Sequence, residues 1–591
     1  MRAFLFICLL SVSLSVYADT LSLEDIIVSD TLSPEEKHLT TRNVIILTKE
    51  DIHKNGYESV EEALDHFGLV DVMSRHQAVQ SDISIRGSSF EQSLVLIDGV
   101  VFNNPQTGHH NLNIPLTLDD IERIEVMPGH SSSLYGSGGF GGTINLITKK
   151  NNDRNLHFSC GYGSFNSQNI SAGASRTPGD YGLMVNLSRQ RSDGFRYDTD
   201  FDIVTGRVSS LYYFNKEEYA HLSYGWGIKD FGAFDFYTPG LNYPSRERTE
   251  DQFFSFYVKK NIKSLYHDTR LYYHDAFDDF ILDKEDPSFS RNIHNVKQYG
   301  IQSTFGLPLF QNLDISFVLG GHYERIDSSS LHRHRRDNYA LGTEILYKRK
   351  KWGMNVSLRG DAYPGSRSYY SPSLGVYYEP GKNLKLRSAA GYSYRMPTFT
   401  DLYYQSSVNK GNENLQAERN MSYEAGADWY KKRFIVRQTF FYRHEYNLID
   451  WVWRKDQWQA ENINYIDFYG WESEFVYYFM DRMKIILRDS YVYARTTTDY
   501  VSKYGLNYTR NLLSFTWQFI LPFEISTSIN GTLKTRKAGD YFLTNLFMKR
   551  DVWQNSSIGF KIKNCFDRDY EEIKGIKQPP REWLIGWDIR V

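Results

Sequence analysis

The sequence has little cysteine, little net charge and no long apolar run beyond its first residues. Three cysteines among 591 residues exclude a disulfide-rich scaffold, and a net charge of −3 gives no electrostatic reason to bind nucleic acid. After the N-terminus no apolar run is long enough for a transmembrane helix, and the mean hydropathy is −0.51. Neither H-E-x-x-H nor G-x-S-x-G occurs, so no catalytic constellation stands out and we expect no enzyme.

Aromatic residues, in contrast, are abundant. They make up 16% of the chain, with 44 Tyr and 37 Phe. A transmembrane β-barrel carries aromatic girdles at its two interfaces and keeps its lumen and loops polar. Composition alone leaves a second interpretation open, a large aromatic-rich soluble β protein. The length exceeds that of one ordinary domain, so we expect more than one.

The N-terminus has the pattern of a secretory signal over residues 1–18. Arg2 gives a basic start, an apolar stretch follows, and Val16-Tyr17-Ala18 offers a cleavage site. Residues 19–42 then form a polar lead that contains one β-branched run, made up of Asp25, Ile26, Ile27, Val28 and Ser29. This run is either a stray strand or a segment that adds to the sheet edge of a partner protein, and its place after the signal favours the second.

Residues 43–150 form a compact mixed α/β unit. Two short β-branched runs end in Arg86-Gly87 and Asp98-Gly99, which are tight-turn signals. A short helix running into a strand is predicted over 118–126, and Ser59 with Glu62 is predicted to form a capping box for a helix that Gly68 ends. The G-x-G-x-x-G run at 136–141 is followed by a strand rather than a helix, so close backbone packing is favoured over a dinucleotide site.

From residue 151 to residue 591 the sequence alternates with a period of two. Leu384, Leu386 and the residues that follow at even spacing alternate with Lys385, Arg387 and their successors. This pattern is typical of a lipid-out, lumen-in barrel, although a soluble sandwich could show it too. The segment suits about 22 strands, a size that holds a plug in its lumen. Of the remaining cysteines, Cys160 and Cys565 have opposite parity, so we predict no disulfide.

Several ordered motifs in residues 83–149 carry a resemblance to a known family. They are Ile85-Arg86-Gly87, Leu96-Ile97-Asp98-Gly99, Ile121-Glu122-Arg123-Ile124-Glu125-Val126, Tyr135-Gly136 and Gly141-Gly142-Thr143-Ile144-Asn145. Together they resemble the plug domain of TonB-dependent outer-membrane receptors. The resemblance implies a membrane all-β fold, a large antiparallel transmembrane β-barrel with an N-terminal mixed α/β plug, in the outer membrane of a Gram-negative bacterium. It also implies that the run at residues 25–29 is a TonB box, which binds the energy-coupling protein TonB.

The barrel segment extends this resemblance. Tyr394 to Phe399, Gly411 to Leu415 and Glu418 look like the family's mid-barrel signature, and Gly470-Trp471-Glu472 looks like the following strand. Asn564 to Tyr570 looks like its penultimate strand and loop. The chain departs from the family at Val591, where an aromatic residue is usual.

Two groups of polar residues are candidate sites. The first lies at the expected plug apex and has two interpretations of equal weight, a hydrogen-bonded loop or a ligand-facing loop; it comprises Asn103, Asn104, Gln106, His109, His110 and Asn111. The second lies in early barrel loops and could hold structural calcium, although solvated aspartates are commoner; it comprises Asp193, Asp198, Asp200, Asp202, Asp230 and Asp235. No cofactor is otherwise expected.

The sequence therefore predicts a ligand-gated, energy-coupled importer, with a passive porin or adhesin as the competing class. The overall resemblance is strongest to cobalamin receptors, because of the early TonB box, the short plug, the Asp-rich loops and the segment 229–239. Ferric siderophores are the alternative. Haem is less favoured, because no His lies between Arg395 and Leu415. Expected partners are TonB, a corrinoid or metal-chelate ligand, outer-membrane lipid and a surface lipoprotein cap.

Overall fold

The computed structural model describes residues 27–28, 31–32, 35–36, 39–76, 78–150, 155–479, 482–496 and 500–591. The predicted signal peptide, and Asp25, Ile26 and Ser29 of the predicted TonB box, lie outside these residues. The other two residues of the box form β1 (Ile27–Val28), which pairs antiparallel with β2 (Glu35–Glu36).

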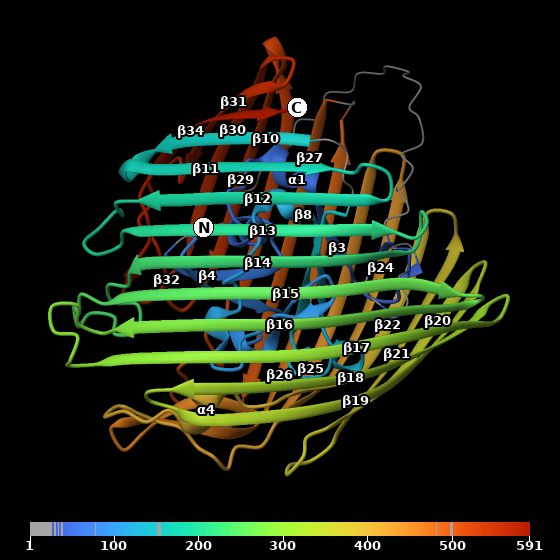
Figure 1. The fold of residues 1–591 in the computed structure, drawn as a ribbon, viewed down its shortest axis with the longest axis horizontal. Coiled ribbons are helices and arrows are strands. Elements are labelled where there is room, and N and C mark those ends of the chain that lie inside the picture. Colours follow the sequence, from blue (N-terminus) through green and yellow to red (C-terminus); the bar gives the residue numbers. More distant parts are fainter. Residues whose placement is uncertain are drawn as a thin grey trace, which may run out of the picture.

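Within the described residues, 22 antiparallel strands close into a barrel around the plug (Figure 1). They are β10 (Asn155–Gly163), β11 (Ser167–Arg176), β12 (Tyr181–Ser192), β13 (Phe201–Tyr213), β14 (Tyr219–Gly232), β15 (Arg246–Ile262), β16 (Leu265–Ile281), β17 (Arg291–Phe310), β18 (Leu313–Ser328), β19 (His332–Arg349), β20 (Trp352–Ala362), β21 (Tyr369–Gly381), β22 (Leu384–Arg395), β24 (Glu418–Lys431), β25 (Phe434–Arg454), β26 (Gln457–Tyr478), β27 (Met483–Thr496), β28 (Asn511–Leu521), β29 (Ile525–Thr535), β30 (Tyr541–Trp553), β31 (Ser556–Lys563) and β34 (Glu582–Arg590). The barrel closes where β10 pairs with β34.

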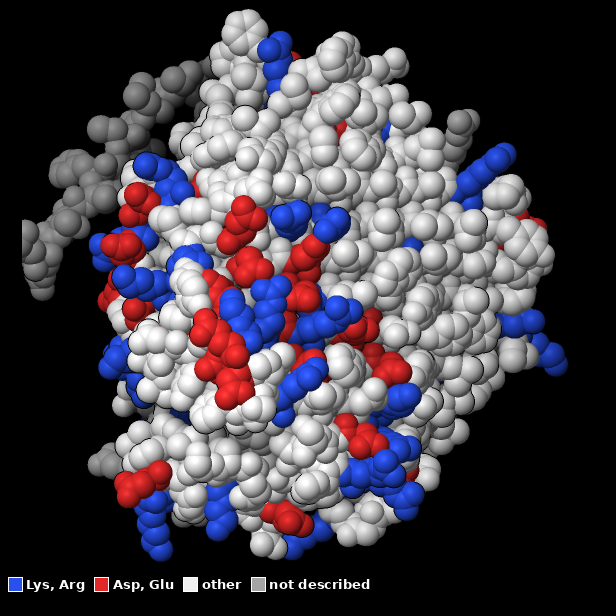
Figure 2. All heavy atoms as spheres, turned by 60° about the vertical axis from the view of Figure 1, so that its left-hand side comes forward, with Lys and Arg blue, Asp and Glu red and all other residues white. Residues whose placement is uncertain are grey.

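The two faces of the barrel wall differ as the alternation predicts. In β22, Leu386 is 41% exposed on the outside, whereas Lys385 and Arg387 are buried on the lumen side. Among the described residues there is no helix with the length and apolarity to cross a membrane. Charged side chains of both signs gather at the end of the barrel that carries the long loops, and the flank beside that end is almost free of them (Figure 2).

Connections at the two ends of the barrel differ in length. The loop end carries 233–245, 282–290, 396–417 and 564–581, whereas the opposite end carries turns such as 263–264, 311–312 and 382–383. The long connections hold short elements of their own, which are α4 (Phe399–Tyr403), β23 (Asn409–Lys410), β32 (Glu571–Ile573) and β33 (Ile576–Lys577). Connections 396–417 and 564–581 both contact the plug, since the Phe399 N–H donates to the Pro105 carbonyl at 2.9 Å and Gln578 Nε2 donates to the Ser74 carbonyl at 2.7 Å.

The plug fills the lumen with a five-stranded sheet in the order β3-β8-β9-β6-β7, beside a separate β4–β5 hairpin. Its strands are β3 (Ile45–Thr48), β4 (Val70–His76), β5 (Gln80–Ile85), β6 (Ser93–Ile97), β7 (Val100–Val101), β8 (Ile121–Pro128) and β9 (Gly142–Thr148). Its helices are α1 (Lys49–Asn55), α2 (Val60–Asp65), α3 (Ser132–Tyr135) and the 3-10 turns η2 (Phe90–Gln92), η3 (Gly108–His110) and η4 (Leu118–Asp120). The predicted helix-to-strand unit at 118–126 is thus confirmed as η4 followed by β8.

Two local predictions in the plug meet different outcomes. The glycine run is confirmed as a packing feature, because a Cβ on Gly141 would lie 2.3 Å from the Ser88 side chain, closer than atoms can approach. The capping box at α2 is only half formed. Ser59 accepts the Glu62 backbone N–H at 3.2 Å, but the Glu62 carboxylate accepts from the Glu58 N–H and pairs with Lys561 of the barrel instead. The two described cysteines, Cys160 and Cys565, are free, as predicted.

Candidate functional site

The predicted apical residues lie in one loop of the plug, between β7 and η4, at the loop end of the barrel. Asn103 fastens this loop to the plug, since its Oδ1 accepts from the Val95 N–H at 2.7 Å and its Nδ2 donates to the Ser93 carbonyl at 2.9 Å. Asn111 Oδ1 accepts from the Asn104 N–H at 3.0 Å. These bonds hold the loop to β6 of the plug and satisfy part of the loop's own backbone.

Other contacts of this loop reach the barrel wall. Asn104 Oδ1 accepts from the Gln106 N–H at 2.8 Å, and Gln106 Nε2 donates to Asp278 Oδ2 of β16 at 2.9 Å. His110 Nε2 lies 3.3 Å from the same carboxylate oxygen. Burial alone would lower the pKa of His110, but the Asp278 carboxylate outweighs it and raises the pKa to about 9. His110 is therefore a cation at neutral pH.

The neighbouring His109 has the opposite charge state. Its Nδ1 lies 2.7 Å from Asp82 Oδ1, and its ring stacks on Phe90 with centroids 4.2 Å apart. Burial lowers the pKa of His109 to about 4 and outweighs the attraction of Asp82. The imidazole is therefore neutral at neutral pH, with Nδ1–H donating to Asp82. Adjacent histidines thus differ because one faces the plug and the other the wall.

Two tyrosines from different barrel loops cover the apex. Tyr504, in the loop before β28, lies with its ring centroid 5.1 Å from that of Phe90 and 5.7 Å from that of His109. Tyr237, from loop 233–245, lies 6.0 Å from the His109 ring and accepts a hydrogen bond from Gln80 Nε2 at 2.6 Å. Apart from Asn103, which is half-buried, the predicted apical residues are buried in this conformation.

The spaces between plug and wall are small. One, of about 100 Å³, lies beside Tyr135 and Gly136 and is lined by Arg270, Arg336 and Arg359 of the wall. Each of these arginines pairs with a carboxylate. Ligand pockets usually start at about 300 Å³. This space is therefore too small to hold a large ligand.

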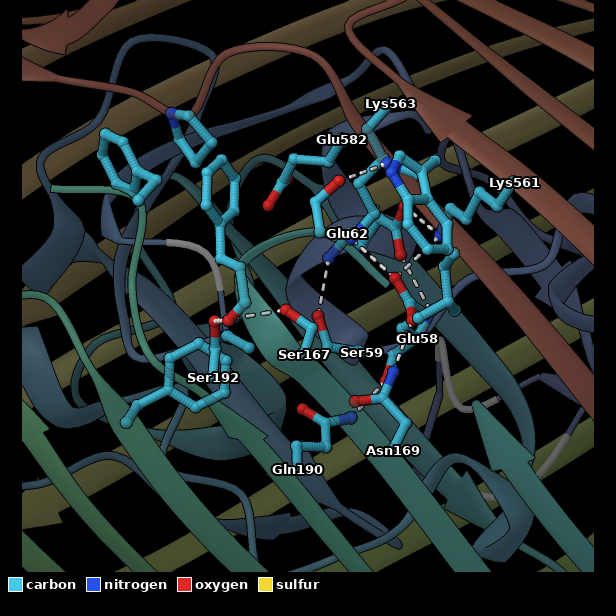
Figure 3. Close-up of a pocket in the computed structure, with 18 of the residues that line it drawn as sticks. Glu58, Ser59, Glu62, Ser167, Asn169, Gln190, Ser192, Lys561, Lys563 and Glu582 are labelled. Carbon is cyan, nitrogen blue, oxygen red and sulfur yellow. Dashed lines mark hydrogen bonds and ion pairs between the residues drawn. The ribbon is translucent and has the colours of Figure 1, made fainter. Parts of the chain in front are cut away.

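A second space, of about 70 Å³, shows how the plug is held (Figure 3). Glu58 and Glu62, beside the start of α2, face the barrel strands. Glu58 accepts from Asn169 Nδ2 at 2.5 Å and pairs with Lys563 at 2.6 Å, while Glu62 pairs with Lys561 at 2.5 Å. These contacts are charged and line a space large enough for water.

Deeper in the lumen, Arg86 makes the central ion pairs between plug and wall. Its Nη1 lies 2.7 Å from Glu424 Oε2 and its Nη2 lies 2.8 Å from Glu472 Oε2, and all three side chains are buried. Arg86 and Glu472 each belong to a motif of the sequence resemblance, but no ion pair between them was predicted. The signal was present, because a charged residue in each of two motifs of one family is a candidate pair.

Four of the six predicted calcium ligands pair closely with cationic side chains. Asp202 pairs with Arg189 at 2.5 Å, and Arg246 bridges Asp200 at 2.7 Å and Asp230 at 2.5 Å. Lys284 pairs with Asp198, while Asp235 accepts from the Asn242 N–H at 2.9 Å and Asp193 lies 4.0 Å from Arg191. Among the described residues these aspartates do not form a group of three clustered ligand atoms. Calcium binding there remains a prediction.

Comparisons with known proteins agree with this architecture. The family model "TonB dependent receptor-like, beta-barrel" matches residues 129–564, and "TonB-dependent Receptor Plug Domain" matches residues 36–143. The chain is 24% identical over 574 residues to the vitamin B12 transporter BtuB of Photobacterium profundum, covering 90% of both proteins. It is 26% identical over 433 residues to the same transporter of Vibrio cholerae, covering 67% of this chain and 66% of that protein.

Solved structures share the fold at lower identity. The FrpB iron transporter of Neisseria meningitidis superposes with a TM-score of 0.80 at 12% identity, covering 94% of this chain and all of that one (100%). The siderophore receptor PirA of Pseudomonas aeruginosa gives 0.74 at 17% identity, covering 93% and 99%. A closed barrel, a plug that fills it and two family models along its length lead to one conclusion: the chain belongs to the TonB-dependent receptors of the outer membrane.

Proposed function

We propose that this receptor imports cobalamin or another corrinoid, with energy supplied through TonB. The observation that carries the proposal is the sequence similarity to vitamin B12 transporters along 90% of the chain. The structures of iron and siderophore receptors, at 12–17% identity, support the shared fold and not a ligand.

The chemistry of the covered apex supports the same class of ligand. A corrinoid is large and flat-faced, and its rim carries amides. In this conformation the amides of Asn104 and Gln106 bond to the loop backbone and to Asp278, and the rim of a corrinoid would replace these partners. The covering loops carry the Tyr237 and Tyr504 rings, which can stack on the flat face of such a ligand.

A ferric siderophore is the second candidate, because three arginines line the cavity beside Tyr135. An anionic iron chelate would pair with such side chains. Each of the three, however, already pairs with a carboxylate, at 3.5 Å for Arg270–Asp268, 2.6 Å for Arg336–Glu324 and 3.0 Å for Arg359–Asp361. The cavity therefore offers no uncompensated positive charge, which favours a neutral ligand.

Titration calorimetry on the purified receptor tests the proposal. We expect cyanocobalamin to bind at submicromolar concentration, and ferric siderophores and haemin to bind far more weakly. Tight binding of a ferric siderophore with no binding of cyanocobalamin would overturn the corrinoid assignment and leave the family unchanged. A Tyr504→Ala variant, which removes a ring that covers the apex, is expected to alter corrinoid affinity without loss of the fold.

A further inference from the structure

Three acidic or imidazole side chains from separate elements converge beneath loop 233–245. His110 comes from η3 of the plug, Glu247 from β15 and Asp278 from β16 of the wall. One ligand-capable atom of each lies within 4.8 Å of those of the other two, and all three residues are buried. We propose that these residues form a site for a divalent transition metal such as Zn²⁺, shared between plug and barrel.

The strand register explains why polar groups meet here. Thr249 of β15 stands directly opposite Asp278, and Asp278 stands directly opposite His294 of β17. Directly opposed residues of an antiparallel sheet point to the same face, so these three side chains form one row facing the lumen. Glu247 lies two residues from Thr249 and shares that face.

Unsatisfied atoms within this row point to a missing partner. Asp278 Oδ1 and Thr249 Oγ1 are buried and, within the described part of the chain, have no hydrogen-bond partner. Asp278 is 7% exposed and Thr249 is 3% exposed, so bulk water does not satisfy these atoms. Buried polar atoms normally have a partner, and a carboxylate oxygen beside an imidazole and a second carboxylate is a metal-ligand arrangement.

The distances and the orientation suit a metal with short bonds. His110 Nε2 and Asp278 Oδ2 are 3.3 Å apart. Two ligands on a tetrahedral Zn²⁺, with bonds of roughly 2.0–2.1 Å, would lie about 3.4 Å apart. Gln106 Nε2 donates to Asp278 Oδ2 at 2.9 Å, which fixes the orientation of that carboxylate.

Charge and ligand type narrow the choice of ion. Binding of the ion releases the proton that His110 carries in its absence, and the neutral imidazole with two carboxylates then balances a divalent cation. Calcium prefers six to eight oxygen ligands, while an imidazole with carboxylates suits zinc, iron or manganese. Glu247 also accepts from the Tyr237 hydroxyl at 3.1 Å, so the loop that covers the apex contacts a ligand of the site.

The position of the site would link the movement of the plug to ion binding. One ligand belongs to the plug and two belong to the wall, so a bound ion would tie the apical loop to the barrel. Movement of the plug during transport would pull His110 away and open the site. This inference does not depend on which ligand the receptor imports.

Metal titration of the full receptor in detergent, freed of any affinity tag and stripped with a chelator, tests the site. We expect calorimetry to show one tight Zn²⁺ site per chain, with at least tenfold weaker binding in Asp278→Asn and in His110→Gln. His274→Gln is the matched control, because His274 is a buried wall histidine that pairs with a single carboxylate, Asp251, at 2.9 Å. It should bind Zn²⁺ like the wild type.

A second readout guards against misfolded variants. Co²⁺ bound to the wild type should give d–d absorption typical of nitrogen and oxygen ligands, and Zn²⁺ should displace it and raise the melting temperature. The proposal is overturned if the stripped wild type takes up no more Zn²⁺ than Asp278→Asn does. It is equally overturned if His274→Gln loses the tight site and Glu247→Gln keeps it.

Discussion

The interior of the plug and its contact with the barrel are built in opposite ways. The interior is apolar, with Leu64, Phe67 and Ile144 each no more than 2% exposed within one continuous core. The contact is richer in polar groups: charged side chains such as Arg86 and Lys534 lie buried against carboxylates across it, although Phe253 of the wall packs into the apolar core. Exposing an apolar contact to water is unfavourable, whereas the charged groups of a separated ion pair can be hydrated by water. The plug can therefore separate from the barrel wall while its own core stays folded.

The largest expected effect is on energy coupling to TonB and not on the stability of the receptor. Ile27→Pro removes a backbone donor from β1 and fixes φ, which should prevent that segment from adding to the sheet of TonB. Uptake of the ligand should be abolished, while surface binding and the melting temperature stay as in the wild type. Uptake assays on whole cells measure this, and normal uptake would mean that the TonB box lies elsewhere.

Removing the central cation should weaken the contact without disturbing the interior. Arg86→Ala leaves Glu472 buried without its cation and Glu424 with Arg387 alone, which should cost about 3–5 kcal/mol of docking free energy. Denaturant unfolding followed by a probe on the plug measures the loss. Adding Glu424→Gln and Glu472→Gln to the variant should restore much of it, and no recovery would mean that packing, not charge, dominates.

A cavity in the interior should destabilise the plug without weakening its contact with the barrel. Leu64→Ala removes a side chain that is 1% exposed and should lower the free energy of unfolding of the plug by about 2–5 kcal/mol. Amide hydrogen exchange should rise throughout the plug and remain unchanged in the barrel strands. Equal increases in both would contradict the separation of the two regions.

Acid should loosen the contact at His130, whose Nδ1 and Nε2 lie 2.9 Å and 3.0 Å from Ser422 and Ser373 of the wall. Burial lowers the pKa of His130 to about 3, and the Arg42 charge acts in the same direction. The pKa of His130 in the unfolded chain is about 6.5, so protonation favours unfolding below that pH. The free energy of unfolding is therefore unaffected by His130 above pH 6.5 and decreases as the pH falls toward 3, by about 2 kcal/mol at pH 5. His130→Gln should remove this part of the pH dependence, and an unchanged pH profile would contradict the prediction.

The smallest expected effect concerns the aspartates of the outer loops. If calcium binds there, millimolar calcium should raise the melting temperature of the wild type slightly, and Asp200→Asn with Asp230→Asn should abolish that gain. Since Arg246 already pairs with both aspartates, the ion must compete with a cation in place. A wild type that shows no gain ends the calcium hypothesis.

The sequence was sufficient for the fold and insufficient for the site. The period-two alternation and the ordered plug motifs predicted the barrel and plug, because each depends on residues close together in the chain. The partners of His110 and Arg86 lie far away in sequence, at Asp278 and at Glu424, so they depend on the register of the wall and on how the plug is seated. The prediction of a complete capping box was wrong for the same reason, since the Glu62 carboxylate pairs with Lys561 of the barrel.

The closing of the barrel has a consequence for its assembly. β10 and β34, from opposite ends of the barrel segment, pair along their length, and the backbone N–H and carbonyl groups of Leu156 and Val591 exchange hydrogen bonds at 2.8 Å. Until β34 arrives, the growing sheet presents two open edges, which a lipid bilayer cannot satisfy. Insertion therefore has no stable halfway point, and the chain must reach the membrane with its final strand already made.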